Sequence, residues 1–323
     1  MEFFRGVNVD WLRLKWYFLA FSMIFSVAGL ISMGLHMHSI GSPVPLGVDF
    51  KGGTQVQAQF TQAPDVNRIR QAMDASGIQD ASIQTIKSVD EPNGNEVLIS
   101  LPEQRDESSL DAGRSRIVGA LQAHYDNPFV VRDVAVVGPT VGKQLEKQAL
   151  LATLYSMAGM LVYLWIRFEL IYGVAAVVAC FHDTLITVGF FALTNQEISL
   201  TVIAAILTLV GYSMNDTIVV FDRIRENLRL SRRESLPDVV NRSINQTLSR
   251  TVLTSGLTFL TVLSLYIFGG QVLRGFSFAL VVGIIIGTYS SIAIAAPMLV
   301  AWQEWRTRQG KAVVLPAAKR ARV

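Results

Sequence analysis

Apolar residues fill six stretches of the chain, each long enough to cross a membrane as a helix. The hydrocarbon core of a bilayer is about 30 Å thick, which takes roughly 17 to 25 helical residues. The six stretches cover residues 16–35, 149–166, 170–193, 198–221, 251–268 and 276–302. The first has no small-x-small cleavage site, so we interpret it as an uncleaved anchor and not as a signal peptide. The pattern therefore predicts an α-helical polytopic membrane protein with six transmembrane helices.

Residues 36–148, between the first two apolar stretches, follow a different pattern. Alternation of apolar and polar positions predicts strands, and helical spacing predicts helices. The strands are expected over 54–60, 81–89, 96–101 and 129–137, and the helices over 64–76 and 110–121. The sequence Glu-Pro-Asn-Gly-Asn at 91–95 predicts a hairpin turn between the second and third strands. The order βαββαβ predicts an α+β ferredoxin-like domain, in which two helices cover one face of an antiparallel sheet.

Basic residues predict how the chain is oriented in the membrane. They lie in residues 1–15, at Arg167 between the second and third stretches, in a predicted loop over 222–250, and in a tail over 303–323. Lys and Arg accumulate in cytoplasmic segments of membrane proteins. Both termini are therefore expected in the cytoplasm, and the domain at 36–148 is expected on the periplasmic or extracytoplasmic side.

The composition supports a membrane protein and argues against several other classes. Hydrophobic residues make up 51% of the chain and charged residues 16%, whereas a soluble domain carries about a quarter charged residues. The net charge of +3 comes from basic residues beside the apolar stretches, so no nucleic-acid site is predicted. The single cysteine, Cys180, excludes an intramolecular disulfide and a Cys-based metal site. We predict no metal, no cofactor and no enzymatic activity.

Two glycine-rich segments resemble phosphate-binding loops only superficially. Residues 47–54 read Gly-Val-Asp-Phe-Lys-Gly-Gly-Thr, and residues 138–143 read Gly-Pro-Thr-Val-Gly-Lys. Neither has the spacing of glycines, lysine and hydroxyl residue that a P-loop requires. We interpret both as tight turns that dock the domain on the ends of the membrane helices. His124 has no ligand residues at metal spacing and is interpreted as structural.

Asp216 is the strongest candidate for chemistry within the apolar stretches. An ionisable side chain there costs about 2.5 to 3.5 kcal/mol on insertion scales, so each one is a functional candidate. Asp216, next to Asn215, lies five residues from the end of the fourth stretch, and Arg250 directly precedes the fifth. The long side chain of Arg250 can point inward to a comparable depth. Loss of contact with water favours the protonated carboxyl group, whereas a nearby guanidinium favours the ionised one, so this pair is a candidate proton switch. A static ion pair between two helices is the alternative interpretation.

Asp183, next to His182, lies near the middle of the third stretch. It is a second candidate for proton coupling, and a structural role is equally open. In that case its side chain would bond to Thr187, one turn further along, or to a neighbouring helix.

Other polar positions are typical of helix packing. Span five carries a stripe of small hydroxyl residues, and residues 283–287 of span six form a GxxxG motif. Besides helix packing, the stripe is a candidate lining for a water path to Asp216. Residues 235–248, with apolar positions at helical spacing and an early proline, predict an amphipathic helix on the membrane surface. The hydroxyl stripe comprises Thr251, Thr254, Ser255, Thr258 and Thr261.

Residues 211–227, Gly-Tyr-Ser-Met-Asn-Asp-Thr-Ile-Val-Val-Phe-Asp-Arg-Ile-Arg-Glu-Asn, resemble the signature of the SecD/SecF family. Further stretches are similar to that family in the expected order along the chain. They are residues 47–54, 137–142, 167–169, 182–183, 246–251 and 254–256. The resemblance implies half of an RND-type bundle and a SecF-type subunit that pairs with SecD.

The resemblance also implies partners and residue roles. Such subunits associate with the SecYEG channel, with YajC and with YidC in the bacterial inner membrane. They use the proton-motive force to pull an unfolded preprotein outward after the ATP-driven steps of SecA. Proton coupling falls on Asp216 of the motif, with Asn215 beside it, and on Arg250 before span five. The competing functions are a proton-driven half-transporter for a lipid or small molecule and a membrane scaffold that does not transport.

Overall fold

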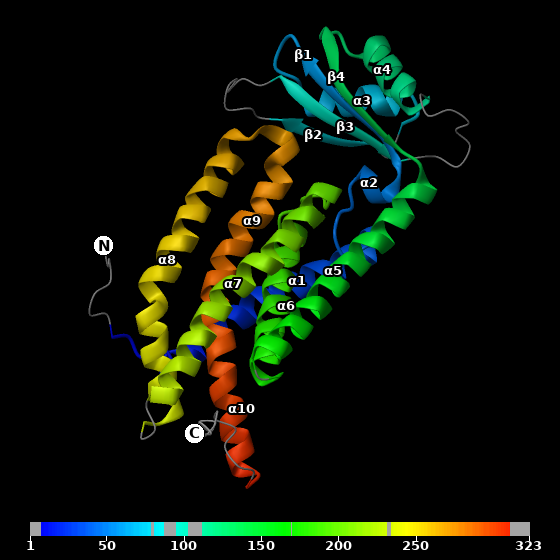
Figure 1. The fold of residues 1–323 in the computed structure, drawn as a ribbon. Helices are drawn as coiled ribbons and strands as arrows, with labels where there is room; N and C mark the ends of the chain where they lie inside the picture. The colour runs from blue at the N-terminus through cyan, green and yellow to red at the C-terminus, as the bar shows by residue number, and fades with distance from the viewer. Residues whose placement is uncertain are drawn as a thin grey trace.

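The computed structural model describes residues 8–78, 81–86, 95–102, 112–168, 170–230 and 234–310. Long helices form a bundle, and a small domain with a β-sheet lies across one end of it (Figure 1). Several predictions fall outside the described residues. They concern residues 1–7, the hairpin segment 87–94, Leu110, Glu169, the arginines at 232 and 233, and the tail beyond 310.

The sheet domain, residues 53–137, has the predicted ferredoxin-like topology. Its elements are β1 (Gly53–Phe60), α3 (Val66–Ala75), β2 (Ser82–Ile86), β3 (Glu96–Pro102), α4 (Ala112–His124) and β4 (Phe129–Val137). The four strands are antiparallel in the order β2-β3-β1-β4. This order confirms the predicted βαββαβ fold.

The two faces of the sheet differ in polarity. Val56, Ala58 and Phe60 of β1 point to the covered face and pack with Ile69 of α3 and Ile117 of α4, all nearly inaccessible to solvent. The residues between them on β1 are glutamines, which point to the opposite face because side chains alternate along a strand. That polar face is turned toward the bundle, where it lines a pocket with residues of the membrane helices.

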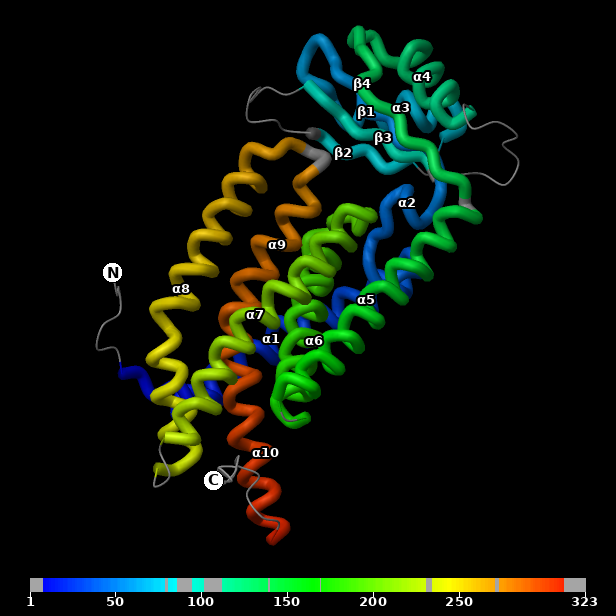
Figure 2. The backbone as a smooth tube through the Cα atoms, in the orientation of Figure 1, coloured from blue at the N-terminus to red at the C-terminus, as the bar shows by residue number. Residues whose placement is uncertain are grey.

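Within the described residues, six helical segments are long and apolar enough to cross a membrane, which confirms the predicted number. They are α1 (Lys15–Ile40), α5 (Pro139–Arg167), α6 (Leu170–Leu193), α7 (Leu200–Leu230), α8 (Leu236–Phe268) and a composite of α9 (Gly270–Ser290), the π-helical turn η1 (Ser291–Ala295) and α10 (Ala296–Arg308). Figure 2 shows the composite sixth segment running the length of the bundle from α9 into α10.

Several helices extend beyond the predicted apolar stretches. Helix α5 begins at Pro139, directly after the sheet domain, and α7 continues to Leu230. Most of the predicted basic loop 222–250 is therefore helical. Residues 236–248 are helical, as predicted, but they are the first turns of α8, which runs from Leu236 to Phe268 without a break. Ser235 accepts a hydrogen bond at the start of α8, Pro237 is tolerated in the first turn, and no further Pro or Gly follows before Gly256.

Helices α6, α7 and α9 form the centre of the bundle, and glycines allow them close contacts. A Cβ at Gly283 would lie 2.5 Å from the Leu209 side chain, and one at Gly287 would lie 3.1 Å from Ser213 Cβ. The predicted packing role of the GxxxG motif is thus confirmed for the α7–α9 contact. Helix α1 approaches α6 in the same way at Gly29 and Gly189.

The first glycine-rich segment attaches the start of α7 to the short helix α2 (Val48–Lys51). The amide of Gly47 donates to the carbonyl of Ile198 at 2.9 Å, and the amide of Leu200 donates to Asp49 Oδ2 at 2.8 Å. Asp49 thereby satisfies a free amide at the N-terminus of α7. The second segment lies against α2, since a Cβ at Gly142 would lie 2.5 Å from the Phe50 carbonyl oxygen. Both glycine-rich segments therefore make docking contacts, as predicted, but they are not tight turns: residues 48–51 form α2, and residues 139–143 begin α5.

Candidate proton-coupling site

Asp216 lies inside the bundle on α7, with 2% of its surface exposed. Its carboxylate atom Oδ2 accepts a hydrogen bond of 2.6 Å from Ser255 Oγ on α8. A buried carboxylate with one short neutral donor is a group whose charge is only partly compensated. A change in its surroundings therefore changes how readily it binds a proton.

The structure does not bring Arg250 into direct contact with Asp216. Both residues are described, and no nitrogen of Arg250 lies within 4.0 Å of the carboxylate, although its charge acts on Asp216 at longer range. Arg250 is exposed, and it precedes Ser255 by five residues on α8. Asn215 is exposed on a different face of α7 from the buried Asp216.

Asp183 is the centre of a second buried network, and it is fully inaccessible to solvent. Its atom Oδ2 accepts hydrogen bonds from Ser213 Oγ on α7 at 2.5 Å and from Ser290 Oγ on α9 at 2.7 Å. Its atom Oδ1 lies 3.0 Å from Nδ1 of His182. His182 Nε2 in turn contacts the hydroxyl of Ser22 on α1. The Asp183 network therefore connects α1, α6, α7 and α9 at one level of the bundle.

One predicted alternative was a bond between Thr187 and the Asp183 side chain. The structure does not show it. The Thr187 hydroxyl donates to the main-chain carbonyl of Asp183 at 2.8 Å. The partners of the carboxylate come instead from neighbouring helices, which was the other structural alternative.

The two carboxylates are linked through one turn of α7. Ser213, which donates to Asp183, precedes Asp216 by three residues, so the two share one face of the helix. Ser290 ends α9 directly before the π-helical turn η1. Single π-helical turns inside longer helices are frequent at functional sites. Helix α7 therefore carries a member of each network within one turn, and α9 joins the Asp183 network through Ser290.

One member of the hydroxyl stripe on α8 contacts a candidate site residue, which its spacing did not reveal. Thr254, Thr258 and Thr261 donate to carbonyl groups of their own helix, which is a local role. Ser255 donates across to Asp216 instead. Ser213 and Ser290 were not predicted as partners of Asp183, because a serine in an apolar stretch is common in helix packing.

Comparisons with protein families match much of the chain. Residues 117–305 match the model of the protein export membrane protein SecD/SecF C-terminal region. The chain belongs to the SecD/SecF family. Residues 39–64 also match the SecD/SecF GG motif, which covers the docking contact at Gly47 and Asp49. Asp183, Asp216 and Ser255 all lie within the SecD/SecF C-terminal region.

Similar members of the SecD/SecF family are named protein translocase subunit SecF. One, from Koribacter versatilis, is 54% identical, and the match covers 99% of this chain and 98% of the relative. Another, from Calditerrivibrio nitroreducens, is 43% identical over 93% of this chain and 96% of the relative.

Two solved structures of SecDF resemble the chain. The crystal structure of SecDF, a translocon-associated membrane protein from Thermus thermophilus, is 35% identical with a TM-score of 0.80, over 93% of this chain and 39% of that one. A SecDF structure in a super-membrane-facing form matches at 35% identity with a TM-score of 0.67, over 94% and 40%. The chain thus spans about two fifths of the solved SecDF chains.

Proposed function

We propose that the chain is a SecF-type subunit of the Sec protein translocase, a transport component of the bacterial inner membrane. With SecD it uses the proton-motive force to promote late stages of preprotein translocation, after the ATP-dependent steps of SecA. SecYEG, YajC and YidC are the further partners, and both termini lie in the cytoplasm with the sheet domain outside. Family membership and the relatives named SecF support this proposal.

The observation that carries the proton-coupling step is the burial of Asp216 against a neutral donor. Asp216 is 2% exposed and bonded to Ser255 on the next helix, with the charge of Arg250 nearby but not in contact. A proton that binds Asp216 removes a buried charge, and its release restores the attraction to Arg250. Asp183 is the second group that we propose to hold a proton in this process. Each proton that crosses the membrane releases about 2.3 kcal/mol per 100 mV of potential.

The test is proton-dependent export of a precursor into sealed inverted membrane vesicles that contain this chain with SecD. We expect Asp216→Asn and Arg250→Met each to abolish the stimulation of export by the proton-motive force. The matched control is Asp222→Asn, which changes a carboxylate on the same helix whose side chain is 58% exposed. The control variant is expected to keep full stimulation.

Assembly with SecD is verified for each variant by co-purification. If assembled Asp216→Asn exports as well as the unchanged chain at full proton-motive force, the proton-coupling proposal is wrong. A strain that lacks the chain separates the rival functions. Normal secretion with altered tolerance to drugs or lipids in that strain would favour a small-molecule transporter.

A further inference from the structure

The sheet domain is joined to the bundle along one side. The chain enters the domain at Gly52–Gly53 and leaves it at Gly138. These connections lie side by side, because Gly53 pairs with Val137 across β1 and β4. Gly52 and Gly53 have φ angles of 75° and 130°, in the region that favours glycine. The two connections together have the geometry of a hinge.

The far edge of the sheet is held by one side chain of the bundle. In the order β2-β3-β1-β4, strand β2 is the edge opposite β4. Glu197 Oε1 accepts hydrogen bonds from Ser82 Oγ at 3.3 Å and from Gln84 Nε2 at 3.1 Å, both on β2. Among hydrogen bonds between described residues, these two join residues 53–137 to the rest of the chain.

Glu197 itself is fixed to the bundle. It lies in the loop between α6 and α7, next to Ile198, whose amide donates to the Pro45 carbonyl at 2.8 Å and whose carbonyl accepts from Gly47. The helices on either side of this loop carry Asp183 and Asp216. A shift of α6 or α7 therefore moves Glu197 directly.

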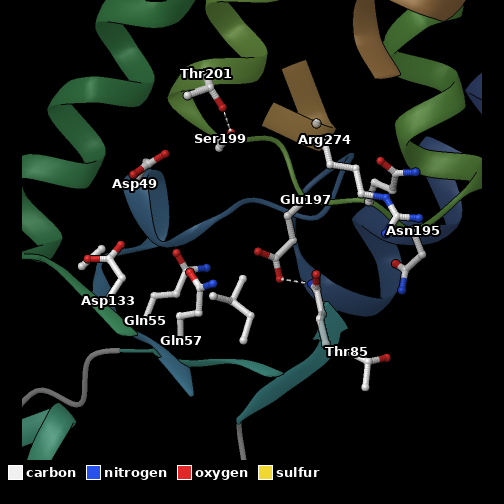
Figure 3. A pocket seen from close by; sticks show the side chains of 15 residues that line it. Asp49, Gln55, Gln57, Thr85, Asp133, Asn195, Glu197, Ser199, Thr201 and Arg274 are labelled. Carbon is white, nitrogen blue, oxygen red and sulfur yellow. Dashed lines mark hydrogen bonds between the residues drawn. The ribbon is translucent and has the colours of Figure 1, made fainter. Parts of the chain in front are cut away.

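A polar pocket of about 440 Å³ separates the hinge from the Glu197 contact. Figure 3 shows Gln55 and Gln57 of the sheet on one side of it, and Glu197 and Arg274 of the bundle on the other. The pocket leaves the polar face of the sheet without a packed apolar contact to the bundle at this point. Two hydrogen bonds from neutral donors contribute only a small net free energy to the closed contact, so they can break and reform.

We propose that Glu197 is a positioning residue, a releasable latch through which α6 and α7 set the angle of the sheet domain about its hinge. This inference rests on the proposed function, because the latch passes a change at the buried carboxyl groups to the sheet domain outside the membrane. The latch breaks and reforms once in each working cycle. Ser82 and Gln84 are the partners on the sheet.

The surroundings of Glu197 act on its ionisation in opposite directions. Burial raises the pKa of Glu197, while the hydrogen bond from Ser82 and the charge of Lys51 on α2 act in the opposite direction. Asp49 on α2, Asp133 on β4 and Arg274 on α9 line the same pocket. The ionised carboxylate is therefore stabilised by its partners and destabilised by its burial.

The experiment locks the latch chemically in the complex with SecD. Cys180→Ala removes the one native cysteine, and Ser82→Cys with Glu197→Cys places thiols on the two sides of the contact. A short bifunctional thiol reagent, cleavable by a reductant, joins them. Relative to the same variant before linking, we expect the link to reduce proton-dependent export at least about fivefold, because a required opening is blocked, and reductant to restore the level before linking.

A matched pair, Ser199→Cys with Thr201→Cys, receives the same reagent, because both residues line the pocket on the bundle side and their hydroxyl oxygens lie 2.8 Å apart. This link is expected to leave export unchanged. Unchanged export with the Ser82–Glu197 link complete would overturn the proposal. So would a linking rate that is the same in resting and in translocating vesicles. Failure of the proposed function has a different signature, since export would then be insensitive to Asp216→Asn.

Discussion

Ser255 Oγ lies 2.6 Å from Asp216 Oδ2, so α7 and α8 meet at a carboxylate through a neutral hydroxyl and not through an ion pair. An Asp–Arg pair in contact would hold the carboxyl group ionised. A serine donor with an arginine at longer range leaves both protonation states accessible, because a hydroxyl can also accept a hydrogen bond from a protonated acid. The relationship between Asp216 and Ser255 therefore suits a group that gains and loses a proton.

Ser255→Ala is expected to impair proton-dependent export without loss of assembly. The change leaves a buried carboxylate oxygen without its donor, which costs about 1–3 kcal/mol. We expect export at full proton-motive force to fall by roughly fivefold to tenfold, equivalent to about 1–1.4 kcal/mol. Thr258→Ala is the control, because its hydroxyl bonds only within α8 and is exposed. Equal export by the two variants would show that the Ser255 bond has no functional role.

Ser213 and Ser290 are expected to act together on Asp183. Both hydroxyls donate to the same oxygen, so each single change to alanine leaves the other donor in place. The double variant leaves that oxygen bare, and its loss of stability should exceed the sum of the single losses by about 0.5–3 kcal/mol. Unfolding of the purified chain in detergent, followed by tryptophan fluorescence, measures this coupling.

Thr187→Val serves as the control for that cycle, since Thr187 bonds only to the main chain of Asp183. Its combination with Ser290→Ala is expected to be additive. Additivity of the Ser213 and Ser290 changes would mean that the two donors do not share one acceptor in the folded chain.

Gly29→Ala is expected to disturb the contact between α1 and α6. A Cβ at this position would lie 2.9 Å from Cα of Gly189, and backbone atoms cannot rotate aside. Such overpacking costs about 1–3 kcal/mol, and it should also weaken the contact between Ser22 and His182. Gly34→Ala on the same helix meets no atom within 4 Å and should preserve or raise the midpoint of thermal unfolding in detergent. Equal midpoints for the two variants would contradict the close approach.

Hydropathy and alternation were sufficient to predict the six spans and the sheet domain, because lipid and a half-buried sheet each impose a strict spacing on apolar residues. Asp183 and Asp216 were also predictable, since a carboxylate in an apolar stretch is costly. Their partners were not. The depth of a residue follows from its place in the stretch, but the rotation of each helix about its axis depends on packing, and that rotation selected Ser255 over Arg250 for contact.

Glu197 shows the same limit for contacts distant in the chain. It appeared to be an ordinary loop residue between two spans, and its partner Ser82 lies 115 positions away in another domain. No local pattern predicts such a pair. The limits of α8 were missed for a related reason, because an amphipathic pattern over 235–248 is the same for a separate surface helix and for the first turns of a long one.

The contact between Glu197 and β2 is expected to depend on the pH of the compartment that holds the sheet domain. Burial raises the pKa of Glu197 in the closed contact, and opening returns the carboxyl group to water and lowers its pKa toward the ordinary value. The closed form therefore binds a proton more tightly, so acid favours closure and opening increases as the pH rises through the raised pKa. Glu197→Gln keeps an acceptor for Ser82 but cannot ionise, and should remove the pH dependence.

Spin labels at Thr85→Cys and Thr201→Cys, in the Cys180→Ala background, report the distance across the pocket that both residues line. We expect a longer mean distance at high pH than at low pH in the presence of Glu197, and one distance at all pH values with Glu197→Gln. A pH-dependent shift that persists in Glu197→Gln would assign the response to Asp49 or Asp133 in the same pocket. A distance that stays constant with Glu197 present would instead contradict the prediction. The burial that raises the pKa of Glu197 would then be the same in every position of the sheet domain, and protonation of Glu197 would not control the hinge.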